Sequence, residues 1–292
     1  MLKGYGHYLK IECAMSPNTV TSYISDVRKF LDFYGGNVED VVPEDIEKYL
    51  LERGDLSERS QARLISALRS FFSWIVQEGY IKDNPCDKVD SPKLGRYLPS
   101  VLSQEEVTAI LTSVDTSSWQ GKRDRAILEV LYSCGLRVSE AVALKISNIY
   151  VKEGFIRVIG KGNKERLVPI GEAAIEALGT YLTERPIPAD RKSDNMVFLN
   201  RFGRSLSRIS MFNMVKKQAL IAGITKEISP HTFRHSFATH LIENGADLRG
   251  VQEMLGHENI TTTEIYTHVE ESKWRQQILQ HHPRSKKTNN SK

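Results

Sequence analysis

The sequence predicts a mainly α-helical protein of two domains: a small N-terminal helical bundle and a larger helical domain that carries one β-hairpin. Three observations support this fold class. Four helical segments with short links fill the first 77 residues. A proline-bearing stretch with almost no periodicity follows at residues 84–103. Beyond it, the clear strand alternation falls at residues 155–170, between further helical segments.

The helices of the first domain are predicted from their apolar spacing and their start and stop signals. Serine-led caps begin two of them, and Gly35-Gly36 ends the second. The four segments are expected within residues 1–14, from Ser16-Pro17 to Gly35, at 43–51, and from Ser57 to about Gln77. We therefore expect a domain at residues 1–90, a linker at 91–103, a second domain at 104–270 and a C-terminal segment at 271–292.

The second domain opens with Ser103 and Glu106, which have the spacing of a helix cap. An apolar helix is predicted at residues 124–133, and further amphipathic helices at 172–185 and 207–223. The hairpin reads FIRVIG, KGNK, ERLVPI, with Lys161 and Lys164 at its turn. Strand alternation is visible in Ile156, Val158 and Leu167.

Charge is distributed unevenly along the chain. Residues 1–95 carry 12 Lys and Arg against 15 Asp and Glu (net −3), whereas residues 96–292 carry 28 against 21 (net +7). The sequence has no apolar run of 18 residues and no secretory leader pattern, so we expect no membrane association. Three widely spaced cysteines fit a reducing cytoplasm, where we expect the protein to be located.

Residues 229–268 concentrate the side chains that carry chemistry. This stretch contains His231, Arg234, His235, His240, His257, Tyr266 and His268. A guanidinium matches phosphate oxygens in a bidentate way, and a tyrosine can act as a covalent nucleophile, so the set favours phosphoryl transfer. His231 and His235 have a metal-ligand spacing, but Arg234 between them opposes a cation. We expect no metal and no cofactor.

Two further groups of residues are candidates on weaker grounds. Arg137 stands at a predicted helix start, where Glu140 could orient it; alone, the pair could equally be a structural salt bridge. Arg59 and Arg63 follow one face of the fourth helix and could contact phosphates of DNA. A solvated helix face explains the same stripe equally well.

Together these segments resemble the tyrosine recombinase family, in the right order and over most of residues 1–282. SPNTVTSYISDVRKFLDF and SERSQARLISALRSFFSW resemble its core-binding domain, CGLRVSEAVAL its first arginine box, and GKGNKERLVPI its hairpin-lysine segment. HTFRHSFATHLIENGADLRGVQEMLGHENITTTEIYTHV resembles its His-x-x-Arg box, its Leu-Gly-His element and its tyrosine segment. The resemblance is to the Xer type. It implies a SAM-like four-helix core-binding domain and a catalytic domain of the DNA breaking-rejoining enzyme fold.

The resemblance also implies a role for each matching residue. Tyr266 would be the nucleophile, Arg137 and Arg234 would bind the scissile phosphate, and His231 would accept a proton or donate a hydrogen bond. His257 matches a third donor position and Lys161 the hairpin lysine. Glu140 would support the site from behind. The implied reaction passes through a 3′-phosphotyrosyl link and a Holliday junction.

The implied partners are double-stranded DNA, a homo- or hetero-tetramer with a second Xer-type recombinase, and a DNA translocase as activator. Residues 271–292 would dock on a neighbouring subunit; packing on their own domain is the alternative. The implied role is chromosome dimer resolution at cell division. The alternatives are an integrase of a phage or mobile element, a non-catalytic DNA-binding regulator with this fold, and a type IB topoisomerase-like enzyme.

Overall fold

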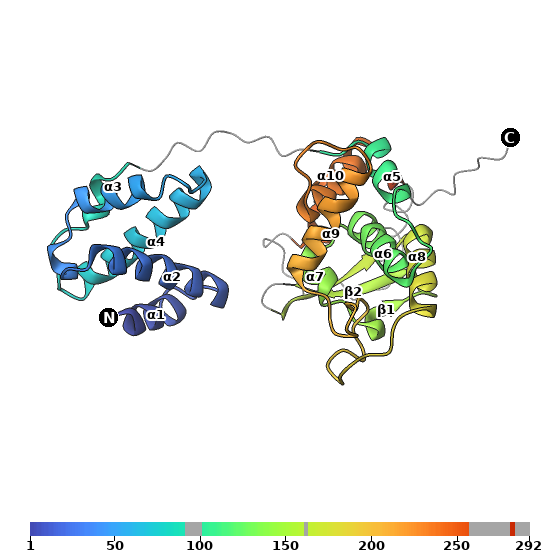
Figure 1. The fold of residues 1–292 in the computed structure, drawn as a ribbon, viewed down its shortest axis with the longest axis horizontal. Helices are drawn as coiled ribbons and strands as arrows, with labels where there is room; N and C mark the ends of the chain where they lie inside the picture. Colours follow the sequence, from blue (N-terminus) through green and yellow to red (C-terminus); the bar gives the residue numbers. More distant parts are fainter. Residues whose placement is uncertain (91–100, 161–162, 257–280, 284–292) are drawn as a thin grey trace. The chain divides into compact units, whose positions relative to one another are not determined.

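The computed structural model describes residues 1–90, 101–160, 163–256 and 281–283. It divides into two compact units, Met1–Leu98 and Pro99–Lys292 (Figure 1). The predicted mainly helical fold with a small antiparallel sheet is confirmed. None of the helices in the described residues is long and apolar enough to cross a lipid bilayer.

The first unit is a bundle of four α-helices whose ends follow the predicted signals. Ser16 caps α2 by accepting a hydrogen bond from the Thr19 amide, and Gly35 ends that helix with a left-handed φ of 68°. Ser57 caps α4 in the same way. The helices are α1 (Leu2–Ile11), α2 (Pro17–Tyr34), α3 (Pro43–Glu52) and α4 (Glu58–Gln77), with a 3-10 turn at Val38–Asp40.

Aromatic side chains fill the core of this bundle. Phe71 of α4 packs edge-on against both Tyr5 and Phe72, and Phe72 packs against Phe30 of α2. The proline-bearing stretch begins inside this unit, because its 3-10 helix Pro85–Lys88 packs on α4 and Arg69 donates to the Cys86 carbonyl at 3.2 Å. At the other end of the stretch, Leu102 is buried in the second unit.

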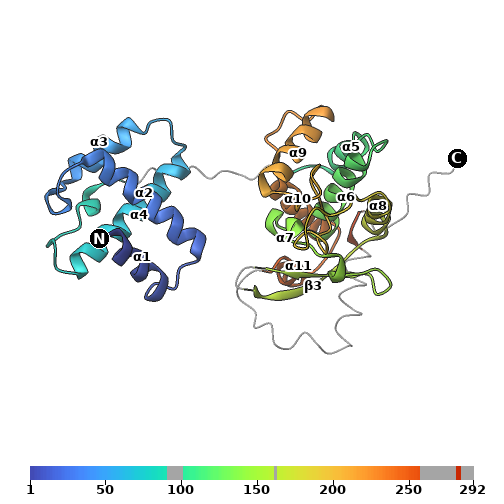
Figure 2. The same cartoon turned by 60° about the horizontal axis from the view of Figure 1, so that its bottom comes forward.

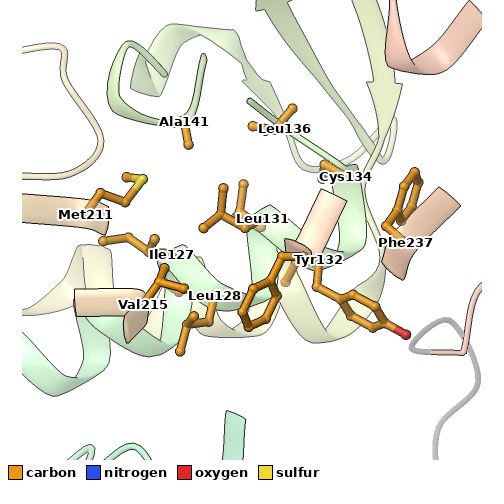
Figure 3. Packing of buried hydrophobic residues seen from close by; sticks show 14 of the residues in the cluster. Ile127, Leu128, Leu131, Tyr132, Cys134, Leu136, Ala141, Met211, Val215 and Phe237 are labelled. Atoms are coloured by element: carbon orange, nitrogen blue, oxygen red, sulfur yellow. The ribbon is translucent and has the colours of Figure 1, made fainter. Parts of the chain in front are cut away.

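The second unit surrounds the buried helix α6. Figure 3 shows its side chains Ile127, Leu128 and Leu131 between Met211 and Val215 of α9 and Phe237 of α10. The helices are α5 (Gln104–Thr112), α6 (Trp119–Cys134), α7 (Val138–Val142), α8 (Glu172–Thr183), α9 (Arg208–Ile221), α10 (Pro230–Glu243) and α11 (Leu248–Leu255), with a 3-10 turn at Ile146–Asn148. Helix α6 begins five residues before the predicted 124–133, where the Ser118 side chain accepts from the Gly121 amide.

The sheet is antiparallel in the order β1 (Ile149–Tyr150), β2 (Phe155–Ile159), β3 (Glu165–Pro169). The predicted hairpin is present, and the short strand β1 was not anticipated. The register pairs Ile156 with Val168 and Val158 with Arg166, so Val168 is buried and Leu167 only half-buried. Helix α11 contacts β3, and Figure 2 shows the two side by side.

Candidate active site

Arg137 is placed by a sharp turn between two helices. Gly135 ends α6 with a left-handed φ of 57°, and Arg137 is the N-cap of α7. A Cβ at Gly135 would lie 2.5 Å from the Phe237 ring, so only glycine fits this turn. The Arg137 side chain keeps 35% of its surface exposed, more than the other arginines of the site described below. It can therefore reach a bound anion.

Glu140 is the buried acceptor around which the site is built. Its carboxylate accepts from the Arg137 amide at 2.8 Å and from Arg137 Nη1 at 2.9 Å. Arg166 donates to both oxygens of the same carboxylate, each at 2.8 Å. Burial alone would raise the pKa of Glu140, but the hydrogen bonds and charges of Arg166 and Arg137 outweigh it and lower that pKa. Glu140 is therefore held ionised at neutral pH.

Arg166 was not among the residues that sequence analysis selected. It lies on β3 opposite Val158, on the inward face of the hairpin. Besides its two bonds to Glu140, its Nε donates to the Met254 carbonyl at 2.8 Å. The signal in the sequence was present but weak: an arginine two residues before the buried Val168, on the same strand face.

Arg234 approaches the same carboxylate from α10. Its side chain is 10% exposed, and Nη1 lies 3.9 Å from Glu140 Oε2. Nη1 also donates to the Gly135 carbonyl at 2.6 Å, and Nη2 to the Leu255 carbonyl. Burial, reinforced by the nearby charge of Arg137, lowers the pKa of Arg234 to about 10. Arg234 remains a cation at neutral pH, in surroundings where an anion would relieve the repulsion between neighbouring guanidinium groups.

The three histidines of α10 occupy two different environments. His231, one turn before Arg234, and His235 are exposed. His240 is buried, and its Nδ1 lies 2.8 Å from the Tyr132 hydroxyl, so it serves the core. Among the described residues, no group of three or more His, Cys, Asp or Glu side chains gathers as a metal site would require.

The structure thus brings Arg137, Glu140 and Arg234 together, with His231 exposed on the first turn of α10. The other candidates of this domain, Lys161, His257 and Tyr266, lie outside the described residues. They follow closely on residues that are described, since Lys161 comes after Gly160 and His257 after Gly256.

The two candidates of the N-terminal unit lie on the exposed side of α4. Arg59 and Arg63 are both exposed. Nη1 of Arg63 donates to Asp26 of α2, which is itself almost buried. Part of the charge of Arg63 is therefore balanced within the bundle, although its side chain keeps 48% of its surface exposed.

The end of the predicted docking segment lies against its own domain where the structure describes it. His282 is buried beside the rings of Tyr132 and Phe237, with ring centroids 5.1 and 5.5 Å away. The neighbouring His281 carbonyl accepts a hydrogen bond from Asn244 at 2.9 Å. At these positions the chain follows the alternative of packing on its own domain. Residues 271–280 and 284–292 lie outside the described part.

Comparison with known proteins agrees with this architecture. The profile of the Phage integrase family matches residues 100–273, and that of the phage integrase N-terminal SAM-like domain matches residues 2–79. The chain is 43% identical to Tyrosine recombinase XerD of Staphylococcus aureus strain Mu50, over 98% of this chain and 99% of that protein.

Two solved structures are similar over nearly the whole chain. XerA recombinase is 30% identical, with a TM-score of 0.51 over 97% of this chain and 98% of that one. An integrase from mycobacterium phage Brujita is 28% identical, with a TM-score of 0.53 over 99% and 95%. The family matches and the relationship to XerD confirm the resemblance seen in the sequence. The chain therefore belongs to the phage integrase family and is a site-specific tyrosine recombinase of the Xer type.

Proposed function

We propose that this recombinase cuts and rejoins double-stranded DNA by attack of Tyr266 on a scissile phosphate that Arg137 and Arg234 bind. The observation that carries the proposal is the convergence of these two guanidinium groups, from α7 and α10, on the buried Glu140. A carboxylate fixed behind two cations orients them without facing the substrate itself.

The chemistry follows from where charge develops. As the Tyr266 oxygen bonds to phosphorus and the bond to the 5′-oxygen breaks, negative charge grows on the phosphoryl oxygens. Donors already in place stabilise this charge, each contributing roughly 10²–10³ in rate by analogy with oxyanion holes. His231 accepts the phenolic proton or donates to the phosphate, and His257 adds a second donor. Lys161 protonates the departing 5′-oxygen.

The product of this step is a 3′-phosphotyrosyl link and a free 5′-hydroxyl. The link retains the energy of the phosphodiester, so a 5′-hydroxyl from a second duplex can reverse the attack and release Tyr266. Two rounds of this exchange pass through a Holliday junction. The reaction as written needs no cofactor.

The N-terminal bundle, residues 1–90, supplies a second DNA contact in this proposal. Arg59 and Arg63 on α4 contact phosphates, which makes binding fall as salt rises. Residues 271–280, ahead of the buried His282, provide the contact with a neighbouring subunit in a tetramer, alone or with a second Xer-type recombinase.

The biological role in this proposal is chromosome dimer resolution at cell division, in the cytoplasm, with a DNA translocase as activator. Its support is the 43% identity to XerD over nearly the full length of both proteins, compared with 28% for the phage integrase. Three free cysteines are compatible with a reducing compartment.

Replacement of the nucleophile tests the proposal. Tyr266→Phe should bind the target DNA normally yet form no covalent adduct with a nicked suicide substrate, in which the cleaved end diffuses away. Tyr80→Phe, at an exposed tyrosine of the N-terminal unit, is the matched control and should form the adduct. A covalent adduct that persists in Tyr266→Phe would show that another residue is the nucleophile.

A further inference from the structure

We propose that Arg166 is a positioning residue of the recombination reaction. It joins Glu140 to the end of α11 and to the base of the hairpin, and so sets where the segments that carry His257 and Lys161 begin. The inference rests on the proposed function, because those two residues matter only if they act on DNA.

All three guanidinium nitrogens of Arg166 donate hydrogen bonds inside the protein. Nη1 and Nη2 each donate to one oxygen of Glu140, and Nε donates to the Met254 carbonyl. The side chain is 9% exposed, and that of Glu140 is 3% exposed. Arg166 is thus placed to act through its neighbours, whereas Arg137 has the exposed surface that an anion needs.

The end of α11 is held by three arginines through three successive carbonyls. Arg166 donates to the Met254 carbonyl and Arg234 to the Leu255 carbonyl. Arg137 donates to the Gly256 carbonyl, at 3.3 Å. The last carbonyls of a helix have no partner within the helix and carry partial negative charge, so cations at this end stabilise it. The next residue in the chain is His257. The phosphate-binding arginines and the start of the His257 segment are therefore tied together.

Gly160, at the base of the hairpin turn, lies close to Arg166 and Glu140. A Cβ at Gly160 would lie 3.4 Å from Arg166 Nη1 and 3.6 Å from Glu140 Oε1. The Gly160 amide donates to the Lys164 carbonyl at 2.8 Å, which closes the turn, and Lys161 comes next in the chain. The Arg166–Glu140 pair therefore also lies beside the residue from which the hairpin lysine extends.

A change at Arg166 should alter the cleavage rate much more than DNA binding. A misplacement of reacting groups by about 1 Å can cost on the order of 10² in rate. Lysine at this position would keep the charge beside Glu140 but could not serve both carboxylate oxygens and the Met254 carbonyl with a planar fork.

The test compares Arg166→Met and Arg166→Lys with Arg157→Met, a control on the same hairpin. Arg157 pairs with Leu167 on the other face and bonds to Asn148. On the suicide substrate, Arg166→Met should cleave on the order of 100-fold more slowly, while DNA affinity stays within roughly threefold. Arg166→Lys should recover part of the rate, and Arg157→Met should match wild type. An unchanged rate in Arg166→Met, or a loss of DNA affinity equal to the loss of rate, would overturn the inference.

A second measurement does not depend on cleavage. In the full-length protein without DNA, Arg166→Met should speed hydrogen exchange of the amides at residues 251–256 and leave those of α5 unchanged. The double variant Glu140→Gln/Arg166→Met removes both buried charges, so it covers the case in which the single variant does not fold. It should show the same faster exchange. Unchanged exchange at α11 overturns the role of Arg166, whereas a wild-type protein that forms no adduct overturns the proposed function.

Discussion

Arg166 and Glu140 form two parallel hydrogen bonds of 2.8 Å between the inward face of β3 and helix α7. Both side chains are almost entirely removed from water. Removing Glu140 would leave the buried guanidinium groups of Arg166 and Arg234 without a counter-charge, at a cost of about 3–5 kcal/mol. The pair therefore links the stability of the domain to the geometry of its candidate active site.

Glu140→Gln should lower the free energy of unfolding at neutral pH by about 3–5 kcal/mol. The pKa of Glu140 in the folded state lies below its ordinary value of 4.5. Its contribution is therefore complete above pH 4.5 and is lost as the pH falls through the lowered value. Urea midpoints of wild type and variant, measured from neutral to acid pH, should converge on the acid side.

Glu165→Gln provides the control, since Glu165 is an exposed carboxylate at the start of β3. Its midpoints should follow those of wild type at each pH. A stability difference for Glu140→Gln that stayed constant across the acid range would contradict the role assigned to the ionised carboxylate.

Arg137→Lys and Arg234→Lys should each slow cleavage by roughly 10²–10³, because lysine keeps the charge but loses the planar fork that matches a phosphate. DNA affinity should change little, since lysine keeps the positive charge on which phosphate binding depends. Single-turnover formation of the covalent adduct measures the rate. Arg204→Lys, on an exposed loop beside Asp190, is the control. Equal rates for all three variants and wild type would remove both arginines from the mechanism.

Gly135→Ala should destabilise the domain by roughly 2–5 kcal/mol, combining the strain of a left-handed alanine with overpacking against Phe237. The φ of 57° and the 2.5 Å approach to that ring are the structural reasons. The matched control is Gly179→Ala in α8, where a Cβ would meet nothing within 4 Å. That change should stabilise by about 0.5–1 kcal/mol. Urea unfolding gives both values, and a neutral Gly135→Ala would contradict the packing described for this turn.

Local signals in the sequence were sufficient to place most helices and the hairpin. Ser16, Ser57 and Ser103 cap the helices that they were expected to cap, and Gly35 ends the second helix as expected. Each of these signals acts within a few residues of the chain, so spacing alone reveals it. The same holds for the contact between Arg137 and Glu140, which are three residues apart.

The contacts that escaped prediction join distant parts of the chain. Arg166 meets Glu140 and Met254, which are 26 and 88 residues away in sequence. Its position on the inward face depends on the hairpin register, and a shift of one residue would exchange the two faces. Arg63 likewise looked like a solvent-facing cation until its partner Asp26, 37 residues away, was placed beside it.

Inorganic sulfate should stabilise the protein through the two phosphate-binding arginines. Burial and the charge of Arg137 lower the pKa of Arg234 to about 10, so its cation is held at a cost that a bound dianion would offset. At ten times its dissociation constant, sulfate should add about 1.4 kcal/mol. For a domain of this size that corresponds to a rise in Tm of about 3–6 °C.

A variant measured in the same solutions separates the general effect of salt on stability from the binding of sulfate. Sulfate stabilises many proteins because it is excluded from their surface. Arg234→Met should retain only the rise in Tm that this exclusion causes. Lys226→Met, which breaks an ion pair with Glu106 that involves none of the site arginines, should keep the full response. Tm measured against sulfate, with sodium chloride at matched ionic strength, distinguishes the two. An identical rise in wild type and Arg234→Met would mean that the arginines do not bind the anion, and so would not bind a scissile phosphate in this conformation.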